Sequence, residues 1–522
     1  MSSETKDDTY PNFKPEETDI SLELTLEEEK RLLRRIDLRI VPYASLLFLL
    51  CFLDRANIGQ ARLAGLEHDL DLHGNQESIG PLFLTSLSPS FSRHMSRVYL
   101  TRFEVPSNLV LRKFTPRRWI SFLMVSWGLV QIGMGLVTNV QGLYVTRFLL
   151  GFFEVGTSIQ SSVTALILIQ AGLFPGLSFI FTMWYTRQEL NIRLAVFITG
   201  AFGGILAFGI RHMAGIGRKN GWAWIFLLEG LFTLLCAIPA LWLIPDFPDT
   251  SNILTPKERT KWLHRLAISQ GITNAPLPFS TRQVIRALRD WRTYAYSLLY
   301  FCMSASFYSL SLFVPTIIAD LGFTNARASL LSAAPYALAV PFMISMSYLS
   351  DKYMVRGPII VASMTITTVG YSVLVCDVSE TAKFIAVFLA VVSTAAAGPT
   401  AITFILRSNV HKSNRNSIGS SAGILASNVY PARDAPRYIR GYSIALALSV
   451  LSVIVAGGLS IYYYKENARR DRIYGPSNPD GSDCNILHIQ DEVKLKMYGL
   501  EGKTREEIIE LGDHHPAFRY TI

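Results

Sequence analysis

Long apolar runs recur along this chain from Arg39 to Lys465, and they constrain its fold more than any other feature. A helix that crosses a bilayer needs roughly 20 mostly apolar residues, and these runs reach that length with short polar breaks between them. Charged residues make up 17% of the chain, against roughly 25% in an ordinary soluble domain. Because lipid offers the backbone no hydrogen-bond partners, each run is predicted to be a helix. The sequence therefore predicts an all-α polytopic membrane protein.

The apolar runs form two sets around a polar centre, so we expect about twelve transmembrane helices in two pseudo-symmetric bundles of six. The predicted parts are an N-terminal tail (1–37), a first bundle (38–245), a central loop (246–292), a second bundle (293–465) and a C-terminal tail (466–522). In the central loop, Thr255 and Glu258 have the spacing of a capping box, with Pro256 at the first helical position. We predict a short amphipathic helix from Thr255 to Leu266 on the membrane surface.

Basic residues lie beside alternate ends of the predicted spans. They cluster in both tails, in the central loop and in the loop with Lys352 and Arg356, so the positive-inside rule places that side in the cytosol. Two outer loops, with Arg218 and Arg437, break the rule. The net charge of +9 comes without a basic aromatic patch, and we expect no nucleic-acid partner. We expect a multi-pass protein of the plasma membrane with both termini in the cytosol.

Motifs for other chemistry are missing from the sequence. The chain has no Walker loop, its histidines are scattered, and its five cysteines have neither a disulfide nor a metal-ligand spacing. We therefore expect no enzyme, no ATP-driven pump, no cofactor and no metal site. Repeated halves around a central site are instead typical of secondary transporters.

Several motifs resemble one transporter superfamily. The loop YLSDKYMVRGP, with Asp351, Lys352 and Arg356, resembles the characteristic cytoplasmic loop of the major facilitator superfamily, and RFLLG, which begins at Arg147, resembles its fourth-helix motif. The segments FLDRANIGQARLAGLEHDL, FEVPSNLVLRKFTPRRWI, GWAWIFLLEG and YPARDAPRYIRGYS are similar to the anion:cation symporter family, and more narrowly to its fungal allantoate and nicotinate permease branch.

This resemblance implies the major facilitator fold and a specific kind of transport. The expected function is proton-coupled symport of a small organic anion, a carboxylate such as allantoate, nicotinate or a related vitamin or metabolite acid, by alternating access. The expected partners are that anion, a proton and the lipid bilayer, with the protein acting as a monomer. In the resembled superfamily, the loop with Asp351, Lys352 and Arg356 would gate the cytoplasmic face.

The chain departs from the family pattern in three places. The segment 155–170 interrupts a run that the family would read as GFFEAGLFPG, and the segment 86–102 departs inside the second span. The eleventh span, near 417–429, is too short for a hydrocarbon core of about 30 Å. We interpret these departures as a faulty gene model with two insertions and one deletion, and a genuine divergent paralogue is the alternative.

Four ionisable residues inside predicted spans are the candidate site, because charge there costs roughly 2.5–3.5 kcal/mol on insertion scales. They are Asp54, Arg55, Arg147 and Glu154. Arginine fits a carboxylate with a planar fork, and a desolvated Asp or Glu can take up a proton. By the resemblance, Arg55 and Arg147 would bind the substrate, and Asp54 and Glu154 would couple protons. The alternative is that these residues form internal ion pairs that let the helices insert.

Two other functions stay open from the sequence. A non-transporting nutrient sensor on the same fold would keep the binding charges and would lose the proton carboxylates or gain a long signalling tail. A defective product of the faulty gene model would neither bind nor transport. Uptake into vesicles separates these alternatives from a working symporter.

Overall fold

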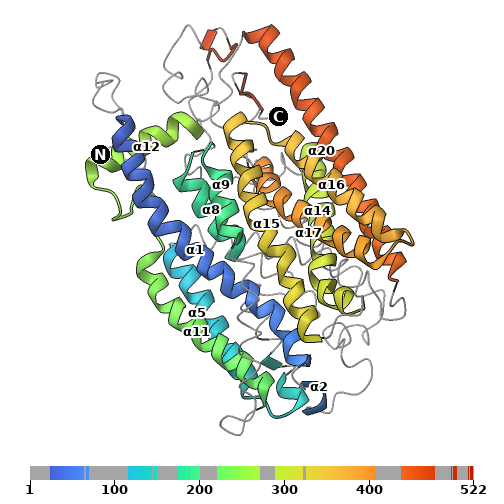
Figure 1. Ribbon diagram of the computed structural model, residues 1–522. Coiled ribbons are helices and arrows are strands. Elements are labelled where there is room, and N and C mark those ends of the chain that lie inside the picture. The colour runs from blue at the N-terminus through green and yellow to red at the C-terminus, as the bar shows by residue number, and fades with distance from the viewer. Residues whose placement is uncertain are drawn as a thin grey trace.

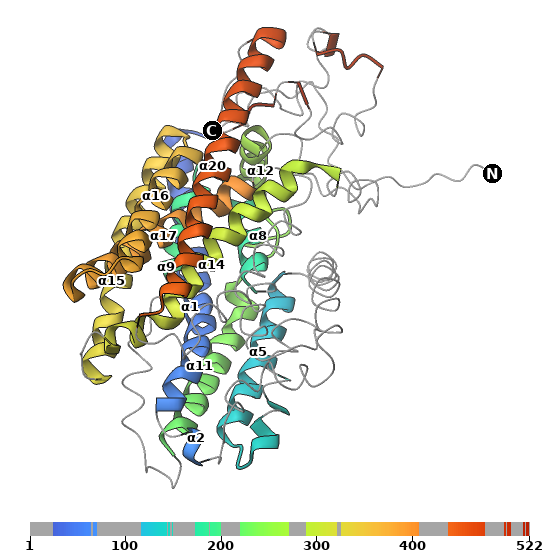
Figure 2. The same ribbon diagram turned by 90° about the vertical axis from the view of Figure 1, so that its right-hand side faces the viewer.

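The computed structural model describes residues 24–63, 66–69, 116–143, 145–146, 149, 173–186, 188–199, 220–270, 289–320, 325–406, 437–475, 495–496, 498–502, 515–516 and 518–520. Within these ranges every regular element is a helix, as predicted. Most helices run side by side along one direction (Figures 1 and 2). The two predicted insertions, 86–102 and 155–170, and the short eleventh span lie outside the described residues.

Helices from the first half of the chain pack together. They are α1 (Leu26–Leu63), α2 (Leu66–Asp69), α5 (Pro116–Gly135), α8 (Leu173–Trp184), α9 (Leu190–Thr199) and α11 (Gly221–Leu243). Helix α1 lies against α9 and α11, and α5 packs along α11. The approach of α5 to α11 is close, because a Cβ atom on Gly230 would lie 2.8 Å from the backbone nitrogen of Ile132.

Helices from the second half form another group. They are α14 (Trp291–Asp320), α15 (Asn325–Tyr353), α16 (Gly357–Val375), α17 (Glu380–Leu406) and α20 (Ile439–Tyr474). Helix α16 lies between α17 and α20, and α14 contacts α15, α17 and α20. The two groups meet where α9 contacts α15 and α17.

The outer surfaces of these helices are apolar. One side of α11 exposes Leu231, Leu235, Ile238 and Trp242 at helical spacing. A stripe of this kind marks a surface that contacts lipid or another protein. Four described helices, α11, α16, α17 as far as Phe404, and α20, are each long and apolar enough to cross a bilayer.

Helices α1 and α20 extend beyond their apolar spans. Helix α1 begins at Leu26, well before residue 38, where the first bundle was predicted to begin. Thr25 and Glu28 form a reciprocal capping box there, with N–H to side-chain oxygen distances of 3.2 and 3.3 Å. Ile36 is buried in this extension, so part of the expected N-terminal tail packs as helix. At the other end, α20 continues to Tyr474, past residue 465, where the second bundle was predicted to end.

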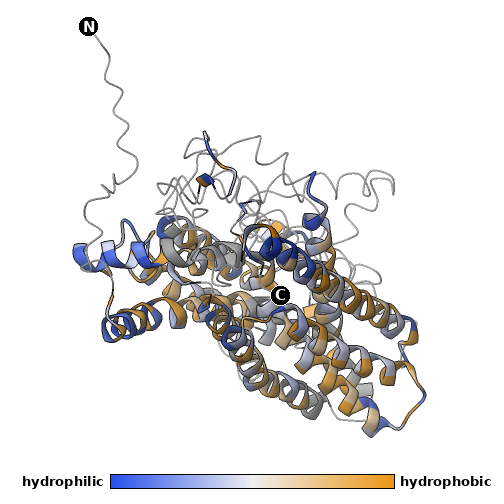
Figure 3. Cartoon of the chain, turned by 90° about the horizontal axis from the view of Figure 1, so that it is seen from above, coloured by the Kyte–Doolittle hydropathy of each residue, from blue (hydrophilic) through white to orange (hydrophobic). Residues whose placement is uncertain are grey.

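These extensions define one face of the molecule, which we call the tail face. It carries the Leu26 end of α1, the central-loop helix α12 (Pro256–Gln270) and the Tyr474 end of α20, at the top of Figure 1. Seen from this face (Figure 3), hydrophilic residues gather on segments near the chain ends, and the helices beneath are largely hydrophobic.

The predicted central-loop helix is confirmed as α12, together with its capping box. The Thr255 N–H donates to Glu258 Oε2 at 2.9 Å, and the Glu258 N–H lies 3.4 Å from Thr255 Oγ1. The prediction that this helix lies on the membrane surface is not tested by the structure. Its apolar side packs against protein, since Trp262 is fully buried and Leu266 is nearly so.

Candidate functional site

The predicted substrate and proton residues fall at the limit of the described structure. Asp54 and Arg55 lie on α1, near its Leu63 end, where the structure describes the backbone alone. Arg147 and Glu154 lie outside the described residues. Their roles therefore stay predictions. The predicted gating residues Asp351, Lys352 and Arg356 are all described.

Asp351 joins the two groups of helices. It lies in the last turn of α15, which ends at Tyr353, and its Oδ2 accepts the Ile192 N–H at 3.0 Å. Ile192 is in the first turn of α9, where backbone N–H groups have no partner within the helix. The positive end of the α9 dipole also favours a carboxylate there. Asp351 thus caps a helix of the other group.

Arg356 is buried beside Asp351. The chain turns sharply at Met354, which has a left-handed φ of 55°, and the Val355 N–H bonds the Ser350 carbonyl at 3.2 Å. This turn brings Arg356 back against α17, where Nη1 donates to the Thr403 carbonyl at 2.9 Å. Its Nη2 lies 3.9 Å from Asp351 Oδ1.

Lys352 points elsewhere. Its side chain is exposed, and its amine lies 5.5 Å from the centre of the neighbouring Tyr353 ring. Of the three predicted gating residues, Asp351 and Arg356 contact other helices at the meeting of the two groups, and within the described part of the chain Lys352 has no such hydrogen bond or ion pair.

Asn191 is a junction residue that the sequence analysis missed. It is fully buried on α9. Its Nδ2 lies 3.4 Å from both the Ser347 carbonyl on α15 and Thr400 Oγ1 on α17, and Thr403 Oγ1 donates to its Oδ1 at 3.4 Å. We call Asn191, Ile192, Ser347, Ser350, Asp351, Arg356, Thr400 and Thr403 the junction. In the sequence Asn191 lies between Glu189 and Arg193, before the apolar run, and without coordinates nothing there indicates a partner.

An ion-pair cluster holds the start of α9 in place. Arg193 donates to both carboxylate oxygens of Asp37 on α1, at 2.6 and 2.7 Å. Arg265 on α12 pairs with Glu189, just before α9, at 2.6 Å, and also with Glu29 on α1. Burial acts to raise the pKa of Glu189, but the hydrogen bonds and charge of Arg265 outweigh it and hold this pKa below its ordinary value. The cluster thereby presents the N-terminus of α9 to Asp351.

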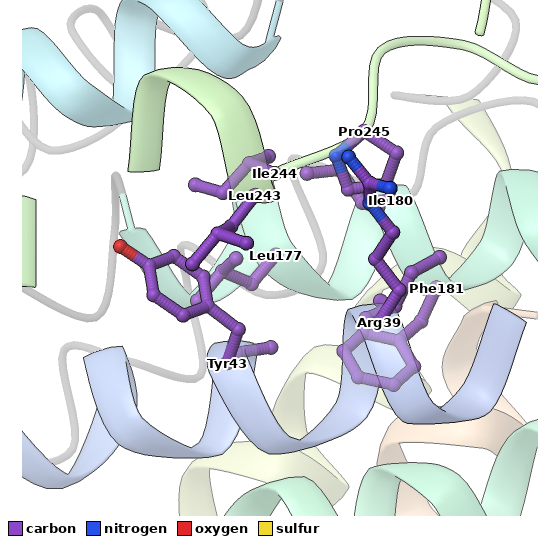
Figure 4. Close-up of a pocket in the computed structure, with 10 residues that line it drawn as sticks. Arg39, Tyr43, Leu177, Ile180, Phe181, Leu243, Ile244 and Pro245 are labelled. Atoms are coloured by element: carbon purple, nitrogen blue, oxygen red, sulfur yellow. The ribbon is translucent and has the colours of Figure 1, made fainter. Parts of the chain in front are cut away.

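A small cavity near the tail face does not suit a charged substrate. It lies between α1, α8 and the end of α11 (Figure 4), and most of its lining is apolar. Its two polar side chains are already engaged, since Arg39 donates to the Trp242 carbonyl at 3.1 Å and Tyr43 donates to the Cys236 carbonyl.

Sequence comparison identifies the family of this two-group helical architecture. Residues 103–459, more than half of the chain, match the family model described as Major Facilitator Superfamily. The chain belongs to the major facilitator superfamily. The MFS-type transporter cnsO of Penicillium expansum is 29% identical and covers 94% of this chain and 90% of its own. An uncharacterized transporter of Schizosaccharomyces pombe is 30% identical, over 87% of this chain and 88% of its own.

Solved structures of the superfamily share the fold. The proton:xylose symporter XylE matches with a TM-score of 0.57 at 14% identity, over 80% of this chain and 94% of its own. The E. coli fucose:proton symporter FucP matches with a TM-score of 0.53 at 13% identity, over 80% and 98%. The predicted fold, two six-helix bundles in a membrane, is therefore confirmed, and this superfamily member is a transporter and not an enzyme.

The titration of Asp351 gives a first prediction for this transporter. Burial raises the pKa of Asp351 to about 6, although Arg356, the backbone N–H groups of Ile192 and Asn191, and the charge of Arg193 all act to lower it. Because the folded-state pKa is raised, Asp351 favours the fold most at acid pH, and this contribution is lost as the pH rises through about 6.

Asp351→Asn is therefore expected to stabilise the protein at pH 7.5 by about 1–3 kcal/mol and to have little effect near pH 4. The amide keeps an acceptor for the Ile192 N–H and removes the buried charge. Thermal unfolding of the purified protein at both pH values measures this, with exposed Asp249→Asn as control. A destabilised Asp351→Asn protein at pH 7.5 would contradict it.

Proposed function

We propose that this chain is a proton-coupled symporter of a small organic anion that works by alternating access as a monomer. The junction is the observation that carries the alternating-access part. Among the described residues, the hydrogen bonds that join helix α9 of the first group to α15 and α17 of the second include four of 3.0–3.4 Å. Polar groups of this kind can be rehydrated when they separate, so the contact can open and close at low cost.

The anionic substrate is proposed from charge within the apolar spans. Arg55 interrupts the apolar run of α1, and an arginine held there needs an anionic partner. Arg55 and Arg147 would bind the carboxylate of a compound such as allantoate, nicotinate or a related acid. Asp54 and Glu154 would take up the proton, because an anion that enters against a negative membrane potential needs an accompanying cation.

We propose that the tail face is cytosolic, in a plasma-membrane protein with both termini inside. The Leu26 end of α1, the Tyr474 end of α20, α12 and the loop that contains Lys352 and Arg356 lie at this face, and it carries basic residues that the positive-inside rule places in the cytosol. The proposed division into bundles at 38–245 and 293–465 follows the same packing.

Uptake measurements test the proposal. Proteoliposomes would be offered radiolabelled allantoate, nicotinate and other small carboxylates, with nicotinamide as an uncharged control, at external pH values of about 5.5 and 7.5. We expect uptake of at least one carboxylate, faster at the acid pH, and none of nicotinamide. A rate of carboxylate uptake that does not change with the proton gradient would contradict proton coupling. Uptake of neutral solutes alone would contradict an anionic substrate.

A further inference from the structure

Residues near the C-terminus pack tightly against the second group of helices. We call His515, Pro516, Phe518, Arg519 and Tyr520 the C-terminal clip. Phe518, Arg519 and Tyr520 are 3%, 4% and 7% exposed, which is core-like burial for a segment predicted to be a tail. In Figure 1 the C-terminus lies at the tail face beside the end of α20.

Side chains of α20 hold the backbone of the clip. Asn467 donates to the Tyr520 carbonyl at 2.7 Å and accepts the Tyr520 N–H at 2.9 Å, so one amide satisfies both backbone groups. Arg470 donates to the Phe518 carbonyl at 2.8 Å, and Arg519 pairs with Asp471 at 2.7 Å. Such reciprocal and charge-assisted bonds fix the clip in one register.

The clip also reaches α14, where the central loop enters the second group. Arg292, at the start of α14, donates to the hydroxyl of Tyr520 and also holds Asp290 at 2.9 Å. Arg292 is 8% exposed. Tyr520 therefore links the beginning of α14 to α20.

Aromatic rings continue this contact from the clip to α17. The ring of Tyr520 stacks on Tyr463 with centroids 4.3 Å apart. Tyr463 lies 6.1 Å from Phe404, and Tyr296 of α14 lies 5.2 Å from the same ring. Phe404 directly follows Thr403, whose hydroxyl contacts Asn191 and whose carbonyl contacts Arg356.

We propose that Tyr520 is a positioning residue for transport. Through Tyr463 and Phe404, it holds the last turns of α17 where Thr400 and Thr403 meet Asn191 and Arg356, and so stabilises the closed junction. This inference rests on the alternating-access part of the proposed function and is independent of the substrate. A population shift needs only that the clip bind the closed state better than the open one.

Cysteine accessibility at the junction tests the proposal. Ser350→Cys would be introduced after the five native cysteines are replaced by serine. Among the described residues the Ser350 hydroxyl is fully buried and has no hydrogen-bond partner, so the substitution removes no such bond. In nanodiscs, Tyr520→Ala is expected to raise the rate of maleimide labelling at position 350 roughly five- to tenfold, the low end of ordinary coupling between sites.

Two variants make this result specific. Tyr464→Ala removes a ring from the same region of α20 that is 65% exposed, and it should label at the parent rate. Tyr520→Phe keeps the stacked ring, so its rate of maleimide labelling should lie between the rates of the parent and of Tyr520→Ala. Parent-like labelling of Tyr520→Ala would overturn the proposal, as would equal acceleration in Tyr464→Ala.

A double-variant cycle separates positioning from general loosening. Asn191→Ala opens the junction directly, so Tyr520→Ala should add much less than its single effect when Asn191 is already replaced. If the double variant's increase in labelling rate equals the product of the two single increases, the two sites are independent and the proposal is overturned. If no carboxylate is taken up but the two substitutions are coupled in this cycle, the proposed substrate class is wrong and the role of Tyr520 is supported. If carboxylates are taken up and the two substitutions act independently, only the role of Tyr520 is wrong.

Discussion

Arg356→Ala is expected to abolish transport and to lower the free energy of unfolding by about 3–5 kcal/mol. The guanidinium is 2% exposed, and its removal takes a donor from the Thr403 carbonyl and the positive charge that lies 3.9 Å from Asp351 Oδ1. The cost is large because a buried carboxylate that loses its partner pays the full desolvation penalty. The loss also falls at the junction, so uptake per folded molecule should drop with stability.

Matched substitutions show whether the effect belongs to the buried guanidinium. Lys352→Ala removes an exposed positive charge from the same loop, and its effect should stay within about 0.5 kcal/mol. Combining Arg356→Ala with Asp351→Asn removes the stranded charge as well, so part of the lost stability should return. Thermal unfolding and uptake in the four proteins measure this. An Arg356→Ala protein that melts with the parent would show that Arg356 does not brace the junction.

The apolar runs were sufficient to predict most of the described helices. A helix in lipid needs continuous apolar residues and internal backbone hydrogen bonds, so the spans can be predicted from the sequence alone. The boundaries were less predictable. Helix α1 extends to Leu26 because Leu32 and Ile36 pack against other parts of the protein, and this contact is invisible in a stretch that reads as charged tail.

The contacts at the tail face join residues far apart in sequence. Arg265 binds Glu29, and Asn467 binds Tyr520. No local sequence pattern predicts either contact. The loop motif located Asp351 and Arg356, because its spacing is distinctive. It could not show that Asp351 caps α9, since that partner depends on how the two groups of helices meet. Asn191 was missed for the same reason.

Arg55→Lys and Arg147→Lys are each expected to reduce carboxylate uptake by at least about tenfold, although both keep the positive charge. Arg55 lies seven residues after Phe48 on α1, which is about two helical turns. Phe48 is buried against Phe197 of α9, with ring centroids 4.7 Å apart. By this register we expect position 55 to continue the inward side of α1. A lysine there offers a single ammonium and no planar fork for a carboxylate.

The proposed division of labour gives the two kinds of substitution different kinetic signatures. Arg→Lys at the substrate site should raise the KM for uptake. Asp54→Asn and Glu154→Gln should instead remove the acceleration of uptake by acid external pH. At least one of these two variants should still exchange substrate. Arg34→Lys, at an exposed position on the same helix, is the matched control and should leave uptake unchanged. If Arg55→Lys and Arg147→Lys both transport like the parent, these arginines serve as internal ion pairs that let their helices insert. The anion must then be bound by other residues.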